Sequence, residues 1–305
     1  MALLRANADD LLHEGLKQVL FQKYEEAKPI WKSIFNTGTS KKKYESGSGF
    51  SGFGMLVEKD ESTGFSNDNP IQGYNTKFTH KAFGLETSIT KEMMDDDQYN
   101  VIKRIPSAFA KSAVRTEETY AANIFNNGFV AGGTFLTGGD GKALFAIDHP
   151  LTGGGTQSNK LSTAAALSVT SFEEALYRLR RTTGDRGEFL ALEPKGLLIP
   201  PELSREGTEL LKSTLRPDTG DNPINWAAQQ GISLISPTGW VYLTSPTAWF
   251  ILTDKDEHNL EFIMRNPSED DAWRDHHTKD FLFSVYERFS VGFWDFRGVF
   301  GTEGA

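Results

Sequence analysis

The sequence predicts an α+β fold, because segments of helical period and runs of strand-forming residues are mixed along the chain. Residues 3–35 and 90–127 carry apolar side chains at helical spacing, which predicts two long helical segments. Four later runs read as strands: GWVYL, AWFILTD, LEFIMR and DFLFSVYERFSVGFWDFRGVF. Helices and strands do not alternate strictly, so a doubly wound parallel sheet is not expected.

Composition bounds the class of protein. The 305 residues are enough for about two domains with a sizeable core. The net charge of −9 disfavours non-specific binding of nucleic acid. The chain has no cysteines, which excludes disulfides, thiolate metal sites and cysteine nucleophiles. The first twenty residues lack the uninterrupted apolar run of a signal peptide, and no run is long enough to span a membrane.

Residues 3–35 are expected to form a helix with a narrow apolar face that needs a partner surface. Pro29 should break or kink this helix. The apolar positions are Leu11, Leu12, Leu16, Val19, Leu20 and Tyr24.

Residues 36–90 are rich in glycine and predict a long hairpin whose tip lies near DESTGFSNDNPIQG, residues 60–73. Phe53, Met55 and Val57 alternate as on one strand. The second strand carries alternating residues on one face: Tyr74, Thr76, Phe78, His80 and Ala82. A two-stranded ribbon cannot bury a core alone, so this segment indicates contact with another surface and hence assembly.

Residues 90–127 are expected to form one long helix with an acid-rich start at Thr90. Pro106 should kink it, and Asn126-Asn127-Gly128 should end it. Its apolar stripe consists of Ile102, Ile105, Phe109, Ala113, Tyr120 and Ile124.

Two further helices and a buried strand are expected in the middle of the chain. Ser171 should cap a helix over 171–181, with Glu174 at the spacing of a capping box. LEPKGLLIPPEL, residues 192–203, reads as a buried strand ended by a proline pair, and residues 201–213 read as a helix.

The candidate motifs for chemistry are weak. GGDGK at 138–142 lacks the first glycine and the following Ser or Thr of a phosphate-binding loop, because Leu136 and Ala143 stand there. A hairpin turn is the better interpretation. His276-His277, beside Asp275 and Asp280, could suggest a metal, but adjacent histidines point to different faces.

The run FAIDHP reads as the end of a strand. Phe145 and Ile147 should alternate inward, Asp148 should form an Asx-turn, and Pro150 should hold His149 extended. A catalytic pair of Asp148 and His149 is the alternative. We expect no catalytic, cofactor-binding or metal-ligating residue, and no cofactor.

Four stretches, in this order, resemble the major capsid proteins of tailed phages, which have the Hong Kong 97 fold. The branch that contains the Mu-like prophage major head subunit is the most similar. The stretches are FGLETSITKEMMDDDQYNVI (83–102), AFAKSAVRTEETYAANIFNNGF (108–129), ALFAIDHPLTGGGTQSNKLS (143–162), and AWFILTD (248–254) with YERFSVGFWDFRGVFGTEG (286–304).

The resemblance implies a division of the chain. The implied parts are an N-terminal arm (1–50), an extended hairpin loop that lies over a neighbouring subunit (51–90), a peripheral domain with a spine helix at 91–127 (91–162), an axial domain (163–245), and return strands of the peripheral domain (246–305).

The resemblance also implies a function: a structural head protein that self-assembles into pentamers and hexamers of an icosahedral shell around double-stranded DNA. Separate scaffold and portal proteins, and decoration proteins, are the expected partners, with assembly in the host cytoplasm and a final place in the virion. Some relatives cross-link a lysine of the extended loop, but nothing selects among Lys59, Lys77 and Lys81, so no cross-link is predicted.

Two alternatives stay open at the level of the sequence. One is the shell of a bacterial nanocompartment that holds an enzyme cargo, built on the same fold. The other is a metal-dependent hydrolase that uses Asp148, His149 and His276. Shell size, triangulation number, host, maturation steps and the residues that face DNA are not determined by the sequence.

Overall fold

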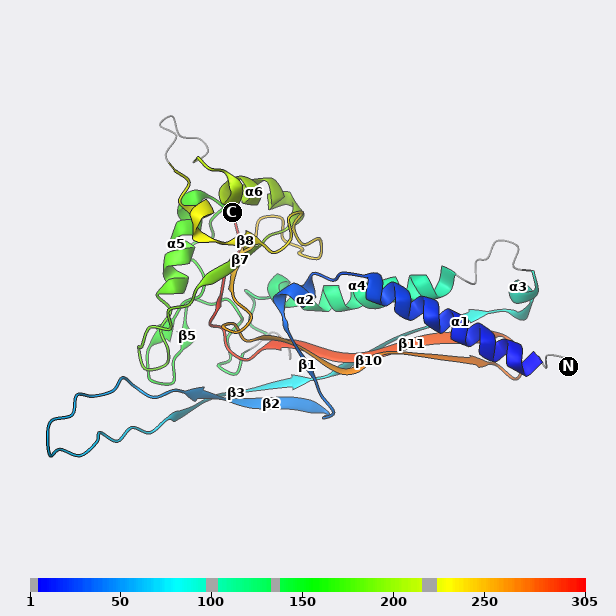
Figure 1. The fold of residues 1–305 in the computed structure, drawn as a ribbon, viewed down its shortest axis with the longest axis horizontal. Coiled ribbons are helices and arrows are strands. Elements are labelled where there is room, and N and C mark those ends of the chain that lie inside the picture. The colour runs from blue at the N-terminus through cyan, green and yellow to red at the C-terminus, as the bar shows by residue number, and fades with distance from the viewer. Residues whose placement is uncertain (1–4, 97–103, 133–137, 216–223) are drawn as a thin grey trace.

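The computed structural model describes residues 5–96, 104–132, 138–215 and 224–305. Three parts are visible in Figure 1: an elongated body of helices and long strands, a lobe that stands at one end of it, and a two-stranded ribbon that runs beneath the body and projects beyond the lobe. Helices and strands are mixed without strict alternation, so the predicted α+β class is confirmed. No helix among the described residues is long and apolar enough to cross a membrane.

The elongated body is a four-stranded sheet with two helices on one face (Figure 1). The strand order is β1-β10-β11-β4, with β1 parallel to β10 and the other pairs antiparallel. The elements are β1 (Asn36–Thr39), β10 (Leu260–Arg274), β11 (Phe281–Phe293), β4 (Lys81–Ile89), α1 (Arg5–Glu26), α2 (Trp31–Ile34), α3 (Lys91–Asp95) and α4 (Ile105–Asn126). Alternate residues of β11 face α4, which is why this strand reads as alternately buried and half-buried.

The first helical segment is broken as predicted. α1 ends at Glu26, Pro29 lies in the link, and the short α2 follows. Leu16 and Leu20 of α1 are buried against the helix α4 and the strand β11, which supply the partner surface that the narrow apolar stripe requires.

The second helical segment starts and ends as predicted, but it consists of two helices, α3 and α4, and not of one, and the predicted kink at Pro106 is wrong. The Thr90 hydroxyl caps α3 by accepting a hydrogen bond from the Met93 amide at 3.2 Å. Ile102 of the expected stripe lies outside the described residues. Pro106 is in the first turn of α4, where an amide has no partner to lose, so it starts this helix and does not bend it. α4 ends at Asn126.

The predicted hairpin exists, but its first strand lies earlier in the chain. β2 (Tyr44–Ser51) pairs with β3 (Ile71–Thr79) in antiparallel register, and residues 52–70 are irregular. The predicted strand at Phe53–Val57 is therefore wrong, because this alternating run has no neighbouring strand to bond with among the described residues of its own chain. Thr76, Phe78 and His80 share a buried face as expected, whereas Ala82 already belongs to β4.

The lobe contains a second four-stranded sheet, in the order β12-β9-β7-β8, and the helices α5 and α6. The helix α5 is capped by Ser168 and not by Ser171; Ser171 is its partner in the capping box, so the cap lies three residues earlier than predicted. The elements are α5 (Val169–Arg180), β7 (Pro194–Leu198), η2 (Pro201–Leu203), α6 (Ser204–Lys212), η3 (Ala227–Gln230), β8 (Ser233–Leu234), β9 (Trp249–Thr253) and β12 (Val299–Thr302).

Two further strand predictions are wrong. GWVYL forms no strand: Gly239 has a φ of 77° and turns the chain, so Trp240 is buried from a turn. Phe145 is buried, but Ile147 is 54% exposed, because the strand there is only β5 (His149–Pro150), paired with β6 (Thr156–Gln157).

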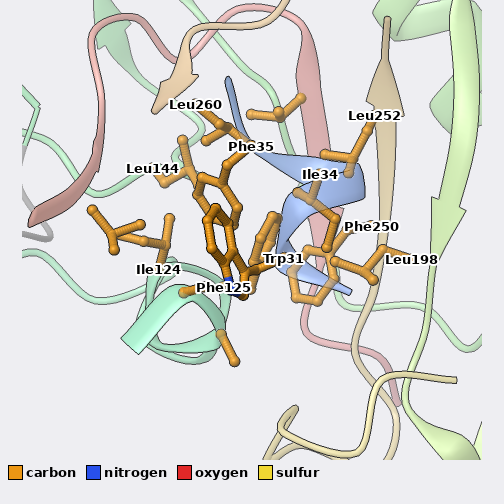
Figure 2. Close-up of a cluster of buried hydrophobic side chains, with 14 of the residues drawn as sticks. Trp31, Ile34, Phe35, Ile124, Phe125, Leu144, Leu198, Phe250, Leu252 and Leu260 are labelled. Carbon is orange, nitrogen blue, oxygen red and sulfur yellow. The ribbon is translucent and has the colours of Figure 1, made fainter. Parts of the chain in front are cut away.

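One aromatic core joins the body and the lobe. Figure 2 shows Trp31 and Phe35 beside Phe125 of α4, with Leu198 and Phe250 from the lobe sheet in the same cluster. Because side chains of both parts are interleaved, the lobe is mounted on the body by close packing and not by a flexible linker.

Candidate functional site

The loop between β2 and β3 carries apolar side chains into solvent. Leu56 is fully exposed and Met55 is 86% exposed. The large exposed hydrophobic residues of this loop and its edge are Phe50, Phe53, Met55, Leu56, Val57, Phe65 and Ile71. A run of apolar surface of this kind typically marks an interaction site. We call residues 52–70 the projecting loop.

The projecting loop is tied to the lobe of its own chain. Arg186 Nη1 lies 2.5 Å from both carboxylate oxygens of Asp68, and Nη2 donates to the Asn69 carbonyl. The Gly54 amide also donates a hydrogen bond to Asp68 Oδ2, at 2.8 Å. The Arg186 guanidinium, followed by that amide, lowers the pKa of Asp68. One carboxylate thus joins the outgoing and returning arms of the loop and fixes both to the lobe.

The base of the ribbon packs on the end of β11. The rings of Phe78 and Trp294 have centroids 4.3 Å apart. A side chain at Gly47 would meet the Trp294 ring at 2.6 Å, so this position requires glycine for the close approach. A cavity of about 480 Å³ lies between the ribbon base, the turn at 138–140 and residues 293–297.

The predicted pair of Asp148 and His149 is not formed. The Asp148 carboxylate accepts from Lys142 Nζ at 2.5 Å. The Asx-turn predicted at Asp148 is wrong, because Pro150, two residues on, has no amide hydrogen to donate. An Asx-turn is formed at Asp140 instead, which accepts from the Lys142 amide at 3.0 Å. His149 is extended, as predicted for a residue before Pro150. The turn expected at 138–142 is present, closed by the bond from the Gly138 amide to the Lys142 carbonyl.

His149 has a structural environment. Its Nδ1 lies 2.6 Å from Asp140 Oδ2, its Nε2 lies 3.2 Å from Asn159 Oδ1, and its ring stacks on Phe296 at 3.7 Å. Burial would raise the pKa of Asp140, but the hydrogen bonds from His149 and the Lys142 amide lower it. The ring is fully buried, so substrate has no access to it.

The structure does not bring the candidate metal ligands together. His276 and His277 lie in the turn between β10 and β11, at the far end of the elongated body from β5 and His149 (Figure 1). Asp275 accepts a hydrogen bond from the His277 amide at 2.7 Å, as a turn residue does. Within the described ranges, no group of three or more His, Asp or Glu residues is arranged to hold a metal ion.

The residue pattern of the sequence did not lead us to predict a buried carboxyl cluster in α4. Glu117 and Glu118 of α4 are 0% and 4% exposed. The Tyr24 hydroxyl and the Trp31 indole, the latter at 3.1 Å, both donate to Glu117. The Trp240 indole donates to Glu118 at 2.6 Å. A signal for the burial of Glu117 was present in the sequence. Glu117 lies four residues from Ala113 and four from Ala121, so it shares the apolar face of α4 with both.

Comparison with known structures identifies the fold. A structure from Microbacterium phage Oxtober96 is 11% identical, with a TM-score of 0.57 over 88% of this chain and 85% of that one. A structure from Mycobacterium phage Adephagia is 9% identical, with a TM-score of 0.57 over 92% and 91%. The mature capsid of bacteriophage PhiM1 is 10% identical, with a TM-score of 0.56 over 90% and 86%. These likenesses confirm the expected Hong Kong 97-type capsid fold.

The sequence comparison agrees with the fold. A model of the phage capsid protein family matches residues 73–301, most of the chain, and the protein belongs to that family. It is a structural capsid protein. No curated protein matches the sequence.

Proposed function

We propose that this chain is the major head subunit that self-assembles into pentamers and hexamers of an icosahedral shell enclosing double-stranded DNA. The observation that carries the proposal is the projecting loop, whose apolar side chains are left exposed by the part of the subunit that the structure describes. Head-to-tail contacts of this kind close into rings when the rotation between copies allows it. Membership of the branch with the Mu-like prophage head subunit stays a prediction.

The proposed parts of the subunit follow the resemblance. They are an N-terminal arm (1–50), an extended loop (51–90), a peripheral domain (91–162 with 246–305) and an axial domain (163–245). In support, α5, α6, β7 and β8 of the lobe fall within the axial range, and α4 runs along the peripheral sheet as a spine helix would. The other two strands of the lobe sheet, β9 and β12, come from the return segment 246–305. Since β4 pairs with β11 in that sheet, we assign the reaching part of the loop to β2, the projecting loop and β3.

The surface charge suits a container. A net charge of −9 repels the DNA backbone, so DNA need not adhere to the wall during filling, and no sequence-specific contact is proposed. We propose no catalytic activity. Scaffold, portal and decoration proteins are the proposed partners, with assembly in the host cytoplasm and a final place in the virion.

Electron microscopy of the purified full-length chain tests the proposal. Closed shells, tubes, or rings of five and six copies are expected, either alone or when the neighbouring genes are expressed together with it. A monomer or dimer under every condition would overturn the proposal. The contents of the particles separate a phage head, which holds DNA, from a nanocompartment, which holds an enzyme.

A further inference from the structure

Three carboxyl groups are buried where the N-terminal helical segment meets the body. Glu117 and Glu118 come from α4, and Glu287 comes from β11. Glu287 is 3% exposed, and its Oε2 has no hydrogen-bond partner among the described groups. An ionised carboxylate without a partner is costly to bury, so Glu287 is best accommodated in this fold with a proton.

The N-terminal segment is held by the same cluster. The Tyr24 hydroxyl of α1 donates to Glu117, as does the Trp31 indole of α2, and the Ile30 amide donates to Glu118 at 2.5 Å. Besides the apolar contacts of Leu16 and Leu20, three hydrogen bonds from this segment therefore end on the carboxyl groups of α4. Any further negative charge placed beside Glu117 weakens the site where the segment is held.

Glu287 can exchange its proton with solvent. It lines a cavity of about 370 Å³ between β4 and α4, whose other walls include Phe83, Leu85, Phe109 and Ala113. This cavity lets water approach the carboxyl group. Its other lining residues, which also include Ser112 and Thr116, carry no compensating charge.

The charges around the cluster do not neutralise it. Lys32 acts on Glu117 and sits over the Trp31 ring at 5.6 Å, while Lys17 of α1 lies 3.7 Å from Asp270. The titratable and charged groups that act on one another in and beside the cluster are Tyr24 (α1), Lys32 (α2), Arg115, Glu117 and Glu118 (α4), Glu287 (β11) and Tyr242. The surrounding elements also carry the pair of Lys17 (α1) and Asp270 (β10), and Lys81 (β4), whose Nζ lies 6.0 Å from the Tyr120 ring centroid.

We propose that Glu287 and Glu117 form a proton-controlled clasp for the N-terminal helix: α1 stays docked on α4 while Glu287 holds its proton, and loss of that proton releases α1 about the link at 27–29. Burial, with a smaller effect of Glu117, raises the pKa of Glu287 to about 8. Release hydrates the carboxyl group and returns its pKa toward 4.5, so docking retains a proton. Docking is therefore strongest at acid pH and weakens up to about tenfold per pH unit as pH rises toward 8.

Distance measurement between two spin labels tests the clasp in the full-length chain. Since the protein has no cysteines, Gln18→Cys on α1 and Thr119→Cys on α4 give a unique labelled pair. At pH 6 one narrow distance distribution is expected, and at pH 9.5 a broad distribution at longer distance. Glu287→Gln, which cannot ionise, should keep the narrow distribution at both values. Glu86→Gln, at an exposed carboxyl group of β4, is the matched control and should behave as the parent does.

Two results would overturn the clasp: an unchanged distribution in the parent up to pH 9.5, or the same broadening in Glu287→Gln. A second variant covers a failure of Glu287→Gln to fold. Tyr24→Phe removes one hydroxyl bond at the helix surface and should move the release to lower pH. A release midpoint that Tyr24→Phe does not move would contradict the clasp equally. The clasp acts within one subunit, so this test does not depend on shell assembly.

Discussion

The projecting loop and the aromatic core around Phe125 contain the same kinds of side chain in opposite environments. In the core, the rings of Phe35, Phe145 and Phe250 all lie within 6.4 Å of the Phe125 ring centroid. In the loop, Leu56 is fully exposed. This difference in exposure is the one that we expect if the loop binds another copy, as proposed above, while the core stabilises the single subunit.

The largest effect on subunit stability is expected in the core. Phe125→Ala should lower the free energy of unfolding by about 3–5 kcal/mol, since it removes a ring with 0% exposure and leaves a cavity. Urea denaturation followed by tryptophan fluorescence measures it. Phe65→Ala, at a loop ring that is 90% exposed, is the matched control and should change stability by less than about 0.5 kcal/mol. Equal losses at the two positions would remove the contrast between the regions.

The buried carboxyl cluster should make stability depend on pH. The pKa of Glu287 is about 8 in the folded chain against 4.5 in the unfolded chain, so the folded protein holds a proton that the unfolded protein has lost between these values. Its contribution to stability is complete below about pH 4.5 and is lost as pH rises through 8, at up to about 1.4 kcal/mol per pH unit. Denaturation at pH 5, 6, 7 and 8 should show this slope, and Glu287→Gln should make it smaller. Identical slopes in parent and variant would contradict the assignment.

A smaller effect is expected at His149. Asp140→Ala removes the carboxylate that bonds the buried imidazole, and should lower the free energy of unfolding by about 1–3 kcal/mol. Asp148→Ala is the control, because that exposed carboxylate only pairs with Lys142 and should matter much less. A larger loss of unfolding free energy in Asp148→Ala than in Asp140→Ala would contradict the assignment of Asp140 as the partner of His149.

The smallest effect on stability is expected at the contact between the loop and the lobe. Arg186→Ala removes the partner of Asp68 from a partly exposed pair on the surface, so the unfolding transition should hardly move. The freed loop should instead be cut faster by trypsin at Lys59, within the projecting loop. Arg178→Ala, which breaks a surface pair with Glu174 inside α5, should leave this cleavage rate unchanged. Equal rates in both variants would show that Arg186 does not hold the loop.

Local signals in the sequence were sufficient for many elements of the fold. Caps and stops such as Thr90 and Asn126 act within a few residues, and so does the Pro29 break; the structure has all three. The predicted strand at Phe53–Val57 failed for a reason that no local signal contains. Alternation indicates a strand, but a strand also needs a neighbour, and within this chain none is available.

The candidate site was harder to predict, because it depends on contacts between distant parts of the chain. Asp148 is adjacent to His149 in sequence, yet Asp140 is its partner in space. Glu117 and Glu287 are separated by most of the chain, and only the packing of α4 on β11 brings their charges together. Residue spacing alone does not encode such pairs.

Electron microscopy of the parent beside a Met55→Ser, Leu56→Ser double variant tests the central claim most directly. Both side chains are exposed in the subunit, so the variant should unfold at the same denaturant concentration as the parent. We expect closed shells from the parent, and folded subunits or isolated rings from the variant. Shells of equal yield and size from both proteins would contradict the claim that the projecting loop makes the contacts between copies.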